Sequence, residues 1–388
     1  MRIVVAPDKF KGSLEAPDVA ARLAAGIRSV DPAAEVVAAP VADGGEGTLE
    51  AALGAGFTAH PLTVTGPVGQ PVEAEFALRG GTAVVEMALA SGLAALPADE
   101  HGDPVLDAGG ATSRGTGELI RAALDAGATS VVLGVGGSAC TDGGAGLLQA
   151  LGARLLDAAG RQLGGGGAQL ARLERVDLTG FDPRVAGAQF VLAADVDNPL
   201  LGQRGAAAVF GPQKGASPED VAALDAALAV LRDRLADALG EPARRAAQIP
   251  GAGAAGGVGY AALAALGARR RPGVEVVLGF VGLAEQVSGA DLVVTGEGSL
   301  DEQSLGGKTP MGVARTARTA GVPVAAVCGR TTLDEQTLRR AGFVRTYALT
   351  DLEPDPRVSM REAGPLLERV GARLAHDLPG LLGTAGAQ

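Results

Sequence analysis

Short runs of β-branched residues alternate along this chain with Ala- and Leu-rich stretches of helical period. This alternation predicts an α/β protein with a largely parallel sheet. We expect strands at 2–6 and 35–42. Between them, a helix capped by Ser13 would place Val19, Leu23 and Ile27 on one face, since these residues are spaced four apart.

The last third of the chain repeats this rhythm. Its predicted strands are 291–295, 323–327 and 344–349, and its predicted helices are 312–320, 334–341 and 360–382. The middle carries predicted strands at 82–86, 129–135 and 189–194 and helices at 116–126, 218–238 and 258–266. Neither end segment supplies a large sheet alone, but together they would make a five-stranded, flavodoxin-like parallel sheet.

The middle is therefore predicted to be an inserted domain. We expect a discontinuous flavodoxin-like domain, 1–71 with 275–388, and an inserted α/β domain with a mixed sheet, 72–274. The active-site cleft would lie between the two domains. A length of 388 residues with 47% hydrophobic residues agrees better with two domains than with one.

Composition excludes several classes of function. A net charge of −11 without a long basic run argues against a nucleic-acid partner or an anionic membrane, and favours a small-molecule substrate. Cys140 and Cys328 are far apart and form no CxxC pair, which is typical of a reducing compartment. We see no signal peptide and no spanning stretch, so we expect a cytoplasmic protein. The three histidines are isolated, which argues against a zinc site.

Lysine is rare in this chain. Of 33 basic residues only four are lysines, which leaves 33 − 4 = 29 arginines. Each lysine, Lys9, Lys11, Lys214 and Lys308, lies in a Gly-, Ser- or Asp-rich segment that is predicted to be a loop. A compact ammonium can enter a phosphate-binding loop where the wider guanidinium cannot. The lysines therefore indicate an anion site.

A glycine-rich segment at 134–144, GVGGSACTDGG, follows a predicted strand and precedes a predicted helix. Such a turn presents backbone N–H groups to an anion. It contains a GxGxxA pattern, Gly134, Gly136 and Ala139, with Asp157 further on, so a dinucleotide-dependent oxidoreductase is an alternative. The pattern is weak in a chain with 60 glycines. Asp142 would also repel a pyrophosphate unless a cation lay between them, and phosphate with Mg²⁺ fits better.

Acidic clusters follow three other predicted strands. The segment 291–309 ends in GGKT, but Glu302 stands where a Walker A motif needs glycine. We expect a cation- or phosphate-binding loop there, at the carboxyl edge of the sheet. The others are Asp43 to Gly47 and the Asp195-x-Asp197 pair, whose carboxylates strand alternation would place on one side, suited to Mg²⁺ or to base catalysis. Each cluster alone could be a simple turn.

Together these segments resemble the glycerate kinase type-1 family. The motifs are PDKFKGSL at the start, ADGGEGT at 42–48, GVGGSACTDGGAG at 134–146, AADVDNPLLG at 193–202, FGPQKGA at 210–216, GAAGGVGYA at 253–261 and TGEGSLDEQSLGGKTP at 295–310. The resemblance covers nearly the whole chain. It implies ATP-dependent phosphorylation of D-glycerate by a flavodoxin-like domain and a second α/β domain.

Phosphoryl transfer requires Mg²⁺, phosphate-binding amides, cations and a carboxylate near the acceptor hydroxyl. The candidates for catalysis or charge stabilisation are Asp195, Asp197, Lys11 and Lys308. Those for binding ATP are Gly136, Gly137, Ser138, Thr141, Lys214, Gly296 and Gly298. Those for binding glycerate are Lys9, Ser13, Asp43, Glu46, Asn198 and Arg204. Those for holding Mg²⁺ are Asp195, Asp197, Glu297 and Asp301. The product could be 2-phosphoglycerate or 3-phosphoglycerate.

Overall fold

The computed structural model describes residues 1–385, and its contacts divide the chain into two compact units. Unit 1 comprises Met1–Asp43, Glu50–Ala55 and the chain from Val274 onward, and unit 2 comprises Gly44–Leu49 and Gly56–Gly273. The boundary expected near residue 72 falls inside a strand of unit 2, β4 (Pro71–Arg79), which pairs with its neighbours on both sides. That each unit is a separate domain stays a prediction.

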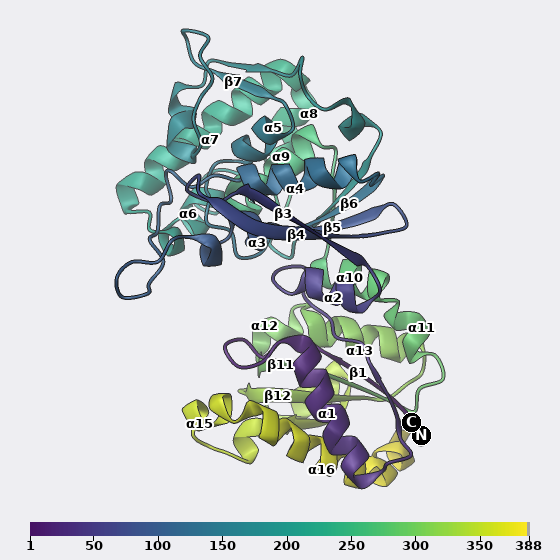
Figure 1. Ribbon diagram of the computed structural model, residues 1–388. Helices are drawn as coiled ribbons and strands as arrows, with labels where there is room; N and C mark the ends of the chain where they lie inside the picture. The colour runs from purple at the N-terminus through teal and green to yellow at the C-terminus, as the bar shows by residue number, and fades with distance from the viewer. Residues whose placement is uncertain (386–388) are drawn as a thin grey trace. The chain divides into compact units, whose positions relative to one another are not determined.

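Unit 1 contains a five-stranded parallel sheet of order β13-β12-β11-β1-β2 (Figure 1). Its strands are β1 (Arg2–Pro7), β2 (Glu35–Ala38), β11 (Leu292–Leu300), β12 (Val324–Thr331) and β13 (Phe343–Ala348). Counted within the unit, this is the order 2-1-3-4-5 of flavodoxin-like sheets. The predicted fold class is confirmed.

Helices cover both faces of this sheet because its strands alternate their side chains between two hydrophobic cores. Ile3 and Val5 of β1 pack with the helices α1 (Ala16–Val30) and α16 (Ala363–Ala385). Val4 and Ala6 pack on the opposite face. The helices there are α10 (Gly273–Val281), α11 (Leu283–Val287), α13 (Thr309–Thr319) and α14 (Glu335–Ala341). Two short helices, α12 (Glu302–Leu305) and α15 (Pro356–Arg361), also belong to unit 1, and α2 (Thr48–Gly54) contributes its residues from Glu50 onward.

Three local predictions in unit 1 were wrong. The residue before α1 is Glu15, and Ser13 lies in the preceding loop, where its amide donates to the carbonyl of Phe10. β2 ends at Ala38, four residues early. β11 continues to Leu300 where a loop was expected after Thr295. Position 296 of β11 has room only for glycine, because a methyl group there would lie 2.0 Å from the carbonyl oxygen of Val327 on β12.

Unit 2 contains a six-stranded sheet of order β10-β9-β6-β5-β4-β3. Its strands are β3 (Thr58–Thr65), β4, β5 (Thr82–Glu86), β6 (Ser130–Gly134), β9 (Gln189–Ala193) and β10 (Arg269–Arg271). The β3, β4 and β5 pairings are antiparallel, and those from β5 to β10 are parallel. The sheet is therefore mixed, as predicted. A separate antiparallel pair joins β7 (Arg154–Leu156) and β8 (Arg175–Asp177).

One hydrophobic core runs through unit 2. Its helices are α3 (Met87–Ser91), α4 (Arg114–Asp125), α5 (Ala145–Ala150), α6 (Ala206–Phe210), α7 (Pro218–Leu239), α8 (Glu241–Ala246) and α9 (Ala254–Ala265). The start of α7 is specified locally, because Ser217 and Asp220 form a reciprocal capping box and Pro218 fits the first turn.

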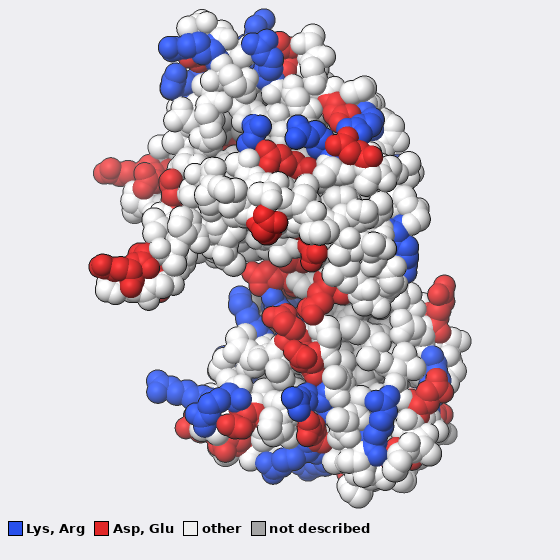
Figure 2. All heavy atoms as spheres, in the orientation of Figure 1, with Lys and Arg blue, Asp and Glu red and all other residues white. Residues whose placement is uncertain are grey.

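Charged side chains of both signs are scattered over the face drawn in Figure 2, with wide uncharged areas between them. That face carries no broad basic patch, as expected for a net charge of −11. Within residues 1–385, no helix is both long enough and apolar enough to cross a membrane.

Candidate functional site

Two loops of unit 2 meet at the carboxyl ends of β5, β6 and β9. The register places Glu86, Gly134 and Ala193 side by side at those ends. Residues 135–144, here called the glycine loop, follow β6. Residues 44–49, here called the N-terminal loop, belong to the same unit. The carboxyl edge of parallel strands is where open α/β folds bind ligands.

The glycines of the two loops allow their backbones to touch. A methyl group on Gly134 would lie 2.8 Å from the carbonyl oxygen of Gly44, and one on Gly136 would lie 2.7 Å from the Cα of Gly45. The buried Glu86 accepts hydrogen bonds from the amides of Gly47 (3.3 Å) and Leu49 (3.0 Å), which holds the N-terminal loop in place. Close packing of the two loops therefore requires glycine at 134 and 136.

The buried carboxylate of Asp142 occupies the N-terminus of α5. It accepts hydrogen bonds from the amides of Gly144 (3.0 Å) and Gly146 (3.1 Å) and from the amide and hydroxyl of Ser113, both at 2.8 Å. A dinucleotide pyrophosphate would need those helix amides. Asp157, the acidic residue of that alternative, pairs instead with Arg161 (3.0 Å) and Arg172 (3.2 Å). The geometry does not favour a dinucleotide here.

Lys214, a candidate for binding ATP, has no exposed surface. Its ammonium donates to the hydroxyl of Ser138 (2.9 Å) and to the carbonyl of Cys140 (2.5 Å). Burial lowers the pKa of Lys214, and the charge of Asp142 opposes that shift. Burial likewise raises the pKa of the Cys140 thiol well above its usual range, so the thiol is neutral. The rare lysine thus supports the glycine loop from inside the unit.

Gly136 and Gly137 are partly exposed on the glycine loop. A methyl group on Gly137 would lie 2.8 Å from Oε1 of Glu46, an exposed side chain of the N-terminal loop. Ser138 is 7% exposed, and Thr141 is fully buried. The Thr141 hydroxyl has no hydrogen-bond partner among the described residues. Four ATP-binding candidates, Gly136, Gly137, Ser138 and Thr141, lie on the glycine loop. Their roles, and the role of Glu46 in binding glycerate, stay predictions.

The Asp195-x-Asp197 pair does not lie on a strand, because β9 ends at Ala193. Asp195 accepts a hydrogen bond from the amide of Gly273 at 2.8 Å. The Asp197 side chain is 69% exposed and pairs with Arg270 at 2.7 Å. The expectation that strand alternation aligns the two carboxylates is therefore wrong. Next to them, the amide of Asn198 donates to the carbonyl of Arg204 at 2.8 Å. The catalytic, metal and substrate roles of these four residues stay predictions.

Unit 1 gathers carboxylates around the carboxyl end of β1, where the neighbouring residue of β11 is Glu297. Asp8, directly after β1, accepts hydrogen bonds from the Thr309 hydroxyl (2.6 Å) and the Lys9 amide (2.7 Å). Burial, together with the negative charges of Asp43 and Glu297, raises the pKa of Asp8 to about 7, although these two hydrogen bonds lower it. Burial also raises the pKa of Glu297. We call Asp8, Asp43 and Glu297 the carboxylate cluster.

The other candidates of unit 1 cap a helix, act on neighbouring carboxylates or allow two segments to lie close together. Asp301 caps α12, accepting from the amides of Gln303 (2.9 Å) and Ser304 (3.2 Å). Lys308 precedes α13, and its charge opposes the rise that burial causes in the pKa of Glu297. A methyl group on Gly298 would lie 3.2 Å from the amide nitrogen of Lys11. The charge of Lys9 acts on Glu50, opposing the rise in the pKa of that carboxyl.

The carboxylate cluster has one property expected of a cation site. Oε1 of Glu297 is buried and has no hydrogen-bond partner among the described residues. A divalent cation would satisfy this oxygen and relieve the repulsion between the carboxylates. However, no set of three or more His, Cys, Asp or Glu side chains within residues 1–385 has ligand geometry already formed. The cluster therefore fits Mg²⁺ only together with oxygens from a ligand such as a phosphate.

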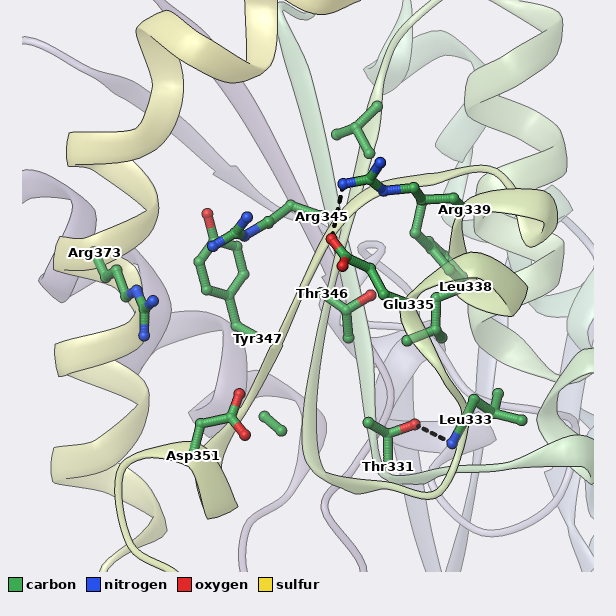
Figure 3. A pocket seen from close by; sticks show the side chains of 13 residues that line it. Thr331, Leu333, Glu335, Leu338, Arg339, Arg345, Thr346, Tyr347, Asp351 and Arg373 are labelled. Carbon is green, nitrogen blue, oxygen red and sulfur yellow. Dashed lines mark hydrogen bonds and ion pairs between the residues drawn. The ribbon is translucent and has the colours of Figure 1, made fainter.

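A cavity of about 350 Å³ opens elsewhere in unit 1, along the edge strand β13 (Figure 3). Arg339 and Glu335 form an ion pair across part of it, at 2.8 Å. The Arg345 guanidinium lies 5.9 Å from the centre of the Tyr347 ring. None of the sequence-predicted candidates lines this cavity, so we do not assign the reaction to it.

Sequence reasoning missed four residues that organise these sites, Asp8, Glu86, Asp142 and Thr309. Asp8 could have been found, because it directly precedes the rare Lys9 at the end of the first strand. Asp142 was considered only as a source of repulsion. Thr309 ends the GGKT segment, but its contact, like that of Glu86, could not be predicted from the sequence, because the partners, Asp8 and Leu49, are 301 and 37 residues away.

Comparisons with known proteins agree with one another. A sequence model of the glycerate kinase family matches residues 3–378. The chain is 43% identical to the glycerate kinase of Bacillus subtilis, covering 97% of this chain and 98% of the relative. It is 45% identical to the glycerate 2-kinase of Escherichia coli K12, covering 90% of each. A crystal structure from Salmonella typhimurium LT2, provisionally described as glycerate kinase 2, superposes with a TM-score of 0.84 at 40% identity and covers 98% of both chains.

Proposed function

This chain belongs to the glycerate kinase family, and we propose from that premise that it transfers the γ-phosphoryl group of ATP, with Mg²⁺, to D-glycerate in the cytoplasm. The observation that carries the proposal is the match of nearly the whole chain to named glycerate kinases. The glycine loop, packed against the N-terminal loop at the carboxyl edge of the unit 2 sheet, supports a phosphate-binding role.

We assign the exposed backbone of Gly136 and Gly137 to the ATP phosphates, because both are partly exposed on the glycine loop. The carboxylate cluster would balance the positive charge of Mg²⁺, and Lys308 would balance the negative charge of the transferred phosphoryl group. Mg²⁺, when bound, neutralises phosphate charge. Asp195 and Asp197 remain candidates for base or metal work. Glycerate carries its own carboxylate, for which Lys9, Lys11 and Arg204 are the candidate partners.

We further propose that the product is 2-phosphoglycerate, because a relative at 45% identity is named a glycerate 2-kinase. Regiochemistry depends on how glycerate is turned toward the γ-phosphate, which makes it a test separate from kinase activity. Phosphorus NMR of the product, compared with authentic 2- and 3-phosphoglycerate, decides between them. A 3-phosphoglycerate product would refute this part of the proposal alone.

The kinase proposal is tested by ADP release coupled to NADH oxidation, with D-glycerate, with L-glycerate and without acceptor. We expect release only with D-glycerate, abolished by excess EDTA and restored by Mg²⁺. Release that is equal with and without D-glycerate, or that persists in EDTA, would contradict the proposal. Direct NAD(H) binding by the purified protein would instead support the oxidoreductase alternative.

A further inference from the structure

Lys214 is a buried cation whose ammonium donates hydrogen bonds to two groups of the glycine loop. It ends a short 3-10 turn, Pro212–Lys214, and has no exposed surface. The acceptors are Ser138 Oγ at 2.9 Å and the Cys140 carbonyl oxygen at 2.5 Å. An ammonium is costly to bury unless it is hydrogen-bonded and balanced by charge. The burial is compensated here by groups of one loop.

Asp142 supplies the opposite charge from within that loop. Its carboxylate has no exposed surface, and it accepts from loop amides on its C-terminal side and from Ser113. The negative charge of Asp142 opposes the fall that burial causes in the pKa of Lys214. The segment 138–146, which runs from the glycine loop into α5, is thus held by the buried Lys214 ammonium at residues 138 and 140 and by the buried Asp142 carboxylate at residues 144 and 146.

We propose that Lys214 and Asp142 are positioning residues that hold the glycine loop in its phosphate-binding shape, and that neither touches the nucleotide. The inference rests on the proposed kinase function for its kinetic consequences only. Complete burial separates both charges from solvent, whereas Gly136 and Gly137, on the same loop, are partly exposed. The scarce lysine therefore serves the phosphate site by shaping it.

The primary test needs no nucleotide. Lys214→Met keeps the apolar stem and removes the charge, and amide hydrogen exchange is followed in the nucleotide-free, full-length protein. We expect peptides covering 138–146 to exchange at least about tenfold faster than in the wild type, since local opening sets the rate. The matched control is Leu235→Ala, a buried core residue of α7 in the same unit. Loop exchange equal to that of the control would overturn the proposal.

Kinetics separate positioning from direct contact. We expect Lys214→Met to raise KM for ATP at least about tenfold, with a smaller change in KM for glycerate, and Lys214→Arg to recover only part of the loss because the guanidinium is wider. Leu235→Ala should leave KM for ATP unchanged. A raised KM together with wild-type loop exchange would mean that Lys214 contacts ATP, and would overturn the proposal. Wild-type protein without glycerate-dependent turnover would instead refute the kinase function and leave the exchange test intact.

Charge balance gives a third test. Asp142→Asn should also accelerate exchange of 138–146, and the double variant Lys214→Met, Asp142→Asn should exchange no faster than the worse single variant. Each single change leaves one uncompensated buried charge, whereas the double change leaves none. Multiplicative effects of the two substitutions on the exchange rate would show that the charges act independently, which contradicts a pair.

Discussion

Asp8 is the residue where local chemistry is most visible. Its carboxyl is held by the Thr309 hydroxyl and the Lys9 amide, yet burial and the charges of Asp43 and Glu297 raise its pKa to about 7. Carboxyl groups with strongly shifted pKa values cluster at functional sites, because catalysis and binding need pKa values matched to their task. Asp8 therefore belongs with the predicted residues Asp43, Glu297 and Lys308, although the motif analysis did not single it out.

A pH dependence follows from this shift. An unfolded Asp loses its proton near pH 3.8, whereas folded Asp8 keeps its proton to about pH 7. Between these values the unfolded state binds fewer protons, so Asp8 makes the free energy of unfolding fall as pH rises from about 4 to about 7. We expect Asp8→Asn to flatten this slope and to be at least as stable as the wild type at about pH 8.

Urea denaturation of metal-free protein across this pH range measures the slope. The exposed loop variant Asp103→Asn is the control and should keep the wild-type slope. Asp8→Asn also tests the metal role of the carboxylate cluster. If the cluster binds Mg²⁺, this variant should lower kcat by about a hundredfold or raise the Mg²⁺ concentration needed for the half-maximal rate. An unchanged slope in Asp8→Asn would contradict the assigned pKa.

At the scale of elements, glycine permits two close approaches of backbone. In unit 1, α1 and α16 pack so closely that a methyl group on Gly26 would lie 2.0 Å from the carbonyl oxygen of Glu368. One on Gly371 would lie 2.4 Å from the carbonyl oxygen of Leu23. In unit 2, the glycine loop rests on the N-terminal loop in the same way. Many glycines of this chain are thus explained by packing.

The helix contact predicts a stability difference within one helix. Gly371→Ala should lower the free energy of unfolding by about 1–3 kcal/mol, because the helices must separate to admit the methyl group. Gly380→Ala, also in α16, meets no heavy atom of the described residues within 4 Å. It should be neutral or stabilising by up to about 1 kcal/mol, since alanine favours helix. Thermal melting compares the two, and equal losses would contradict the close packing.

The loop contact predicts an effect on activity. Gly136→Ala would force the glycine loop away from Gly45, so we expect kcat/KM for ATP to fall at least about tenfold. Gly164→Ala is matched, because its methyl group meets no heavy atom of the described residues within 4 Å. It should keep wild-type kinetics. Normal kinetics in Gly136→Ala would remove the glycine loop from the phosphate site.

At the scale of the whole molecule, two sheets of different kind carry the candidate residues. The parallel sheet of unit 1 holds the carboxylate cluster at its carboxyl edge, and the mixed sheet of unit 2 holds the glycine loop at the carboxyl ends of its parallel strands. Chain topology makes both units depend on distant segments. β1 pairs with β11, for example, across nearly 300 residues.

The stabilisation of the folded protein by a bound ligand tests which ligands the whole molecule binds. A ligand that binds only the folded protein at a hundred times its Kd stabilises it by about 2.7 kcal/mol. We therefore expect ATP with Mg²⁺ to raise the melting temperature by several degrees, and D-glycerate to add to it. NADH at the same concentration should leave melting unchanged. A larger shift with NADH than with ATP would favour the oxidoreductase alternative.

The amino-acid sequence by itself determined the α/β class, the five-stranded flavodoxin-like sheet and the glycine- and acid-rich segments at strand ends. These features are local, because strand and helix periodicity and turn chemistry are written in neighbouring residues. The ends of β2 and β11 and the cap of α1 were missed, because pairing with adjacent strands and loops overrides local propensity.

Only the tertiary structure decided what each polar residue does. Lys214 was predicted to bind ATP and is fully buried against the glycine loop, and Asp142, expected to repel an anion, accepts hydrogen bonds from the amides of Gly144 and Gly146 at the start of α5. The raised pKa of Asp8 comes first from its burial and then from the charges of Asp43 and Glu297. Burial and electrostatic coupling depend on residues that are distant in sequence and close in space. Local patterns therefore identified the candidate segments, and folding set the surroundings of each of their side chains.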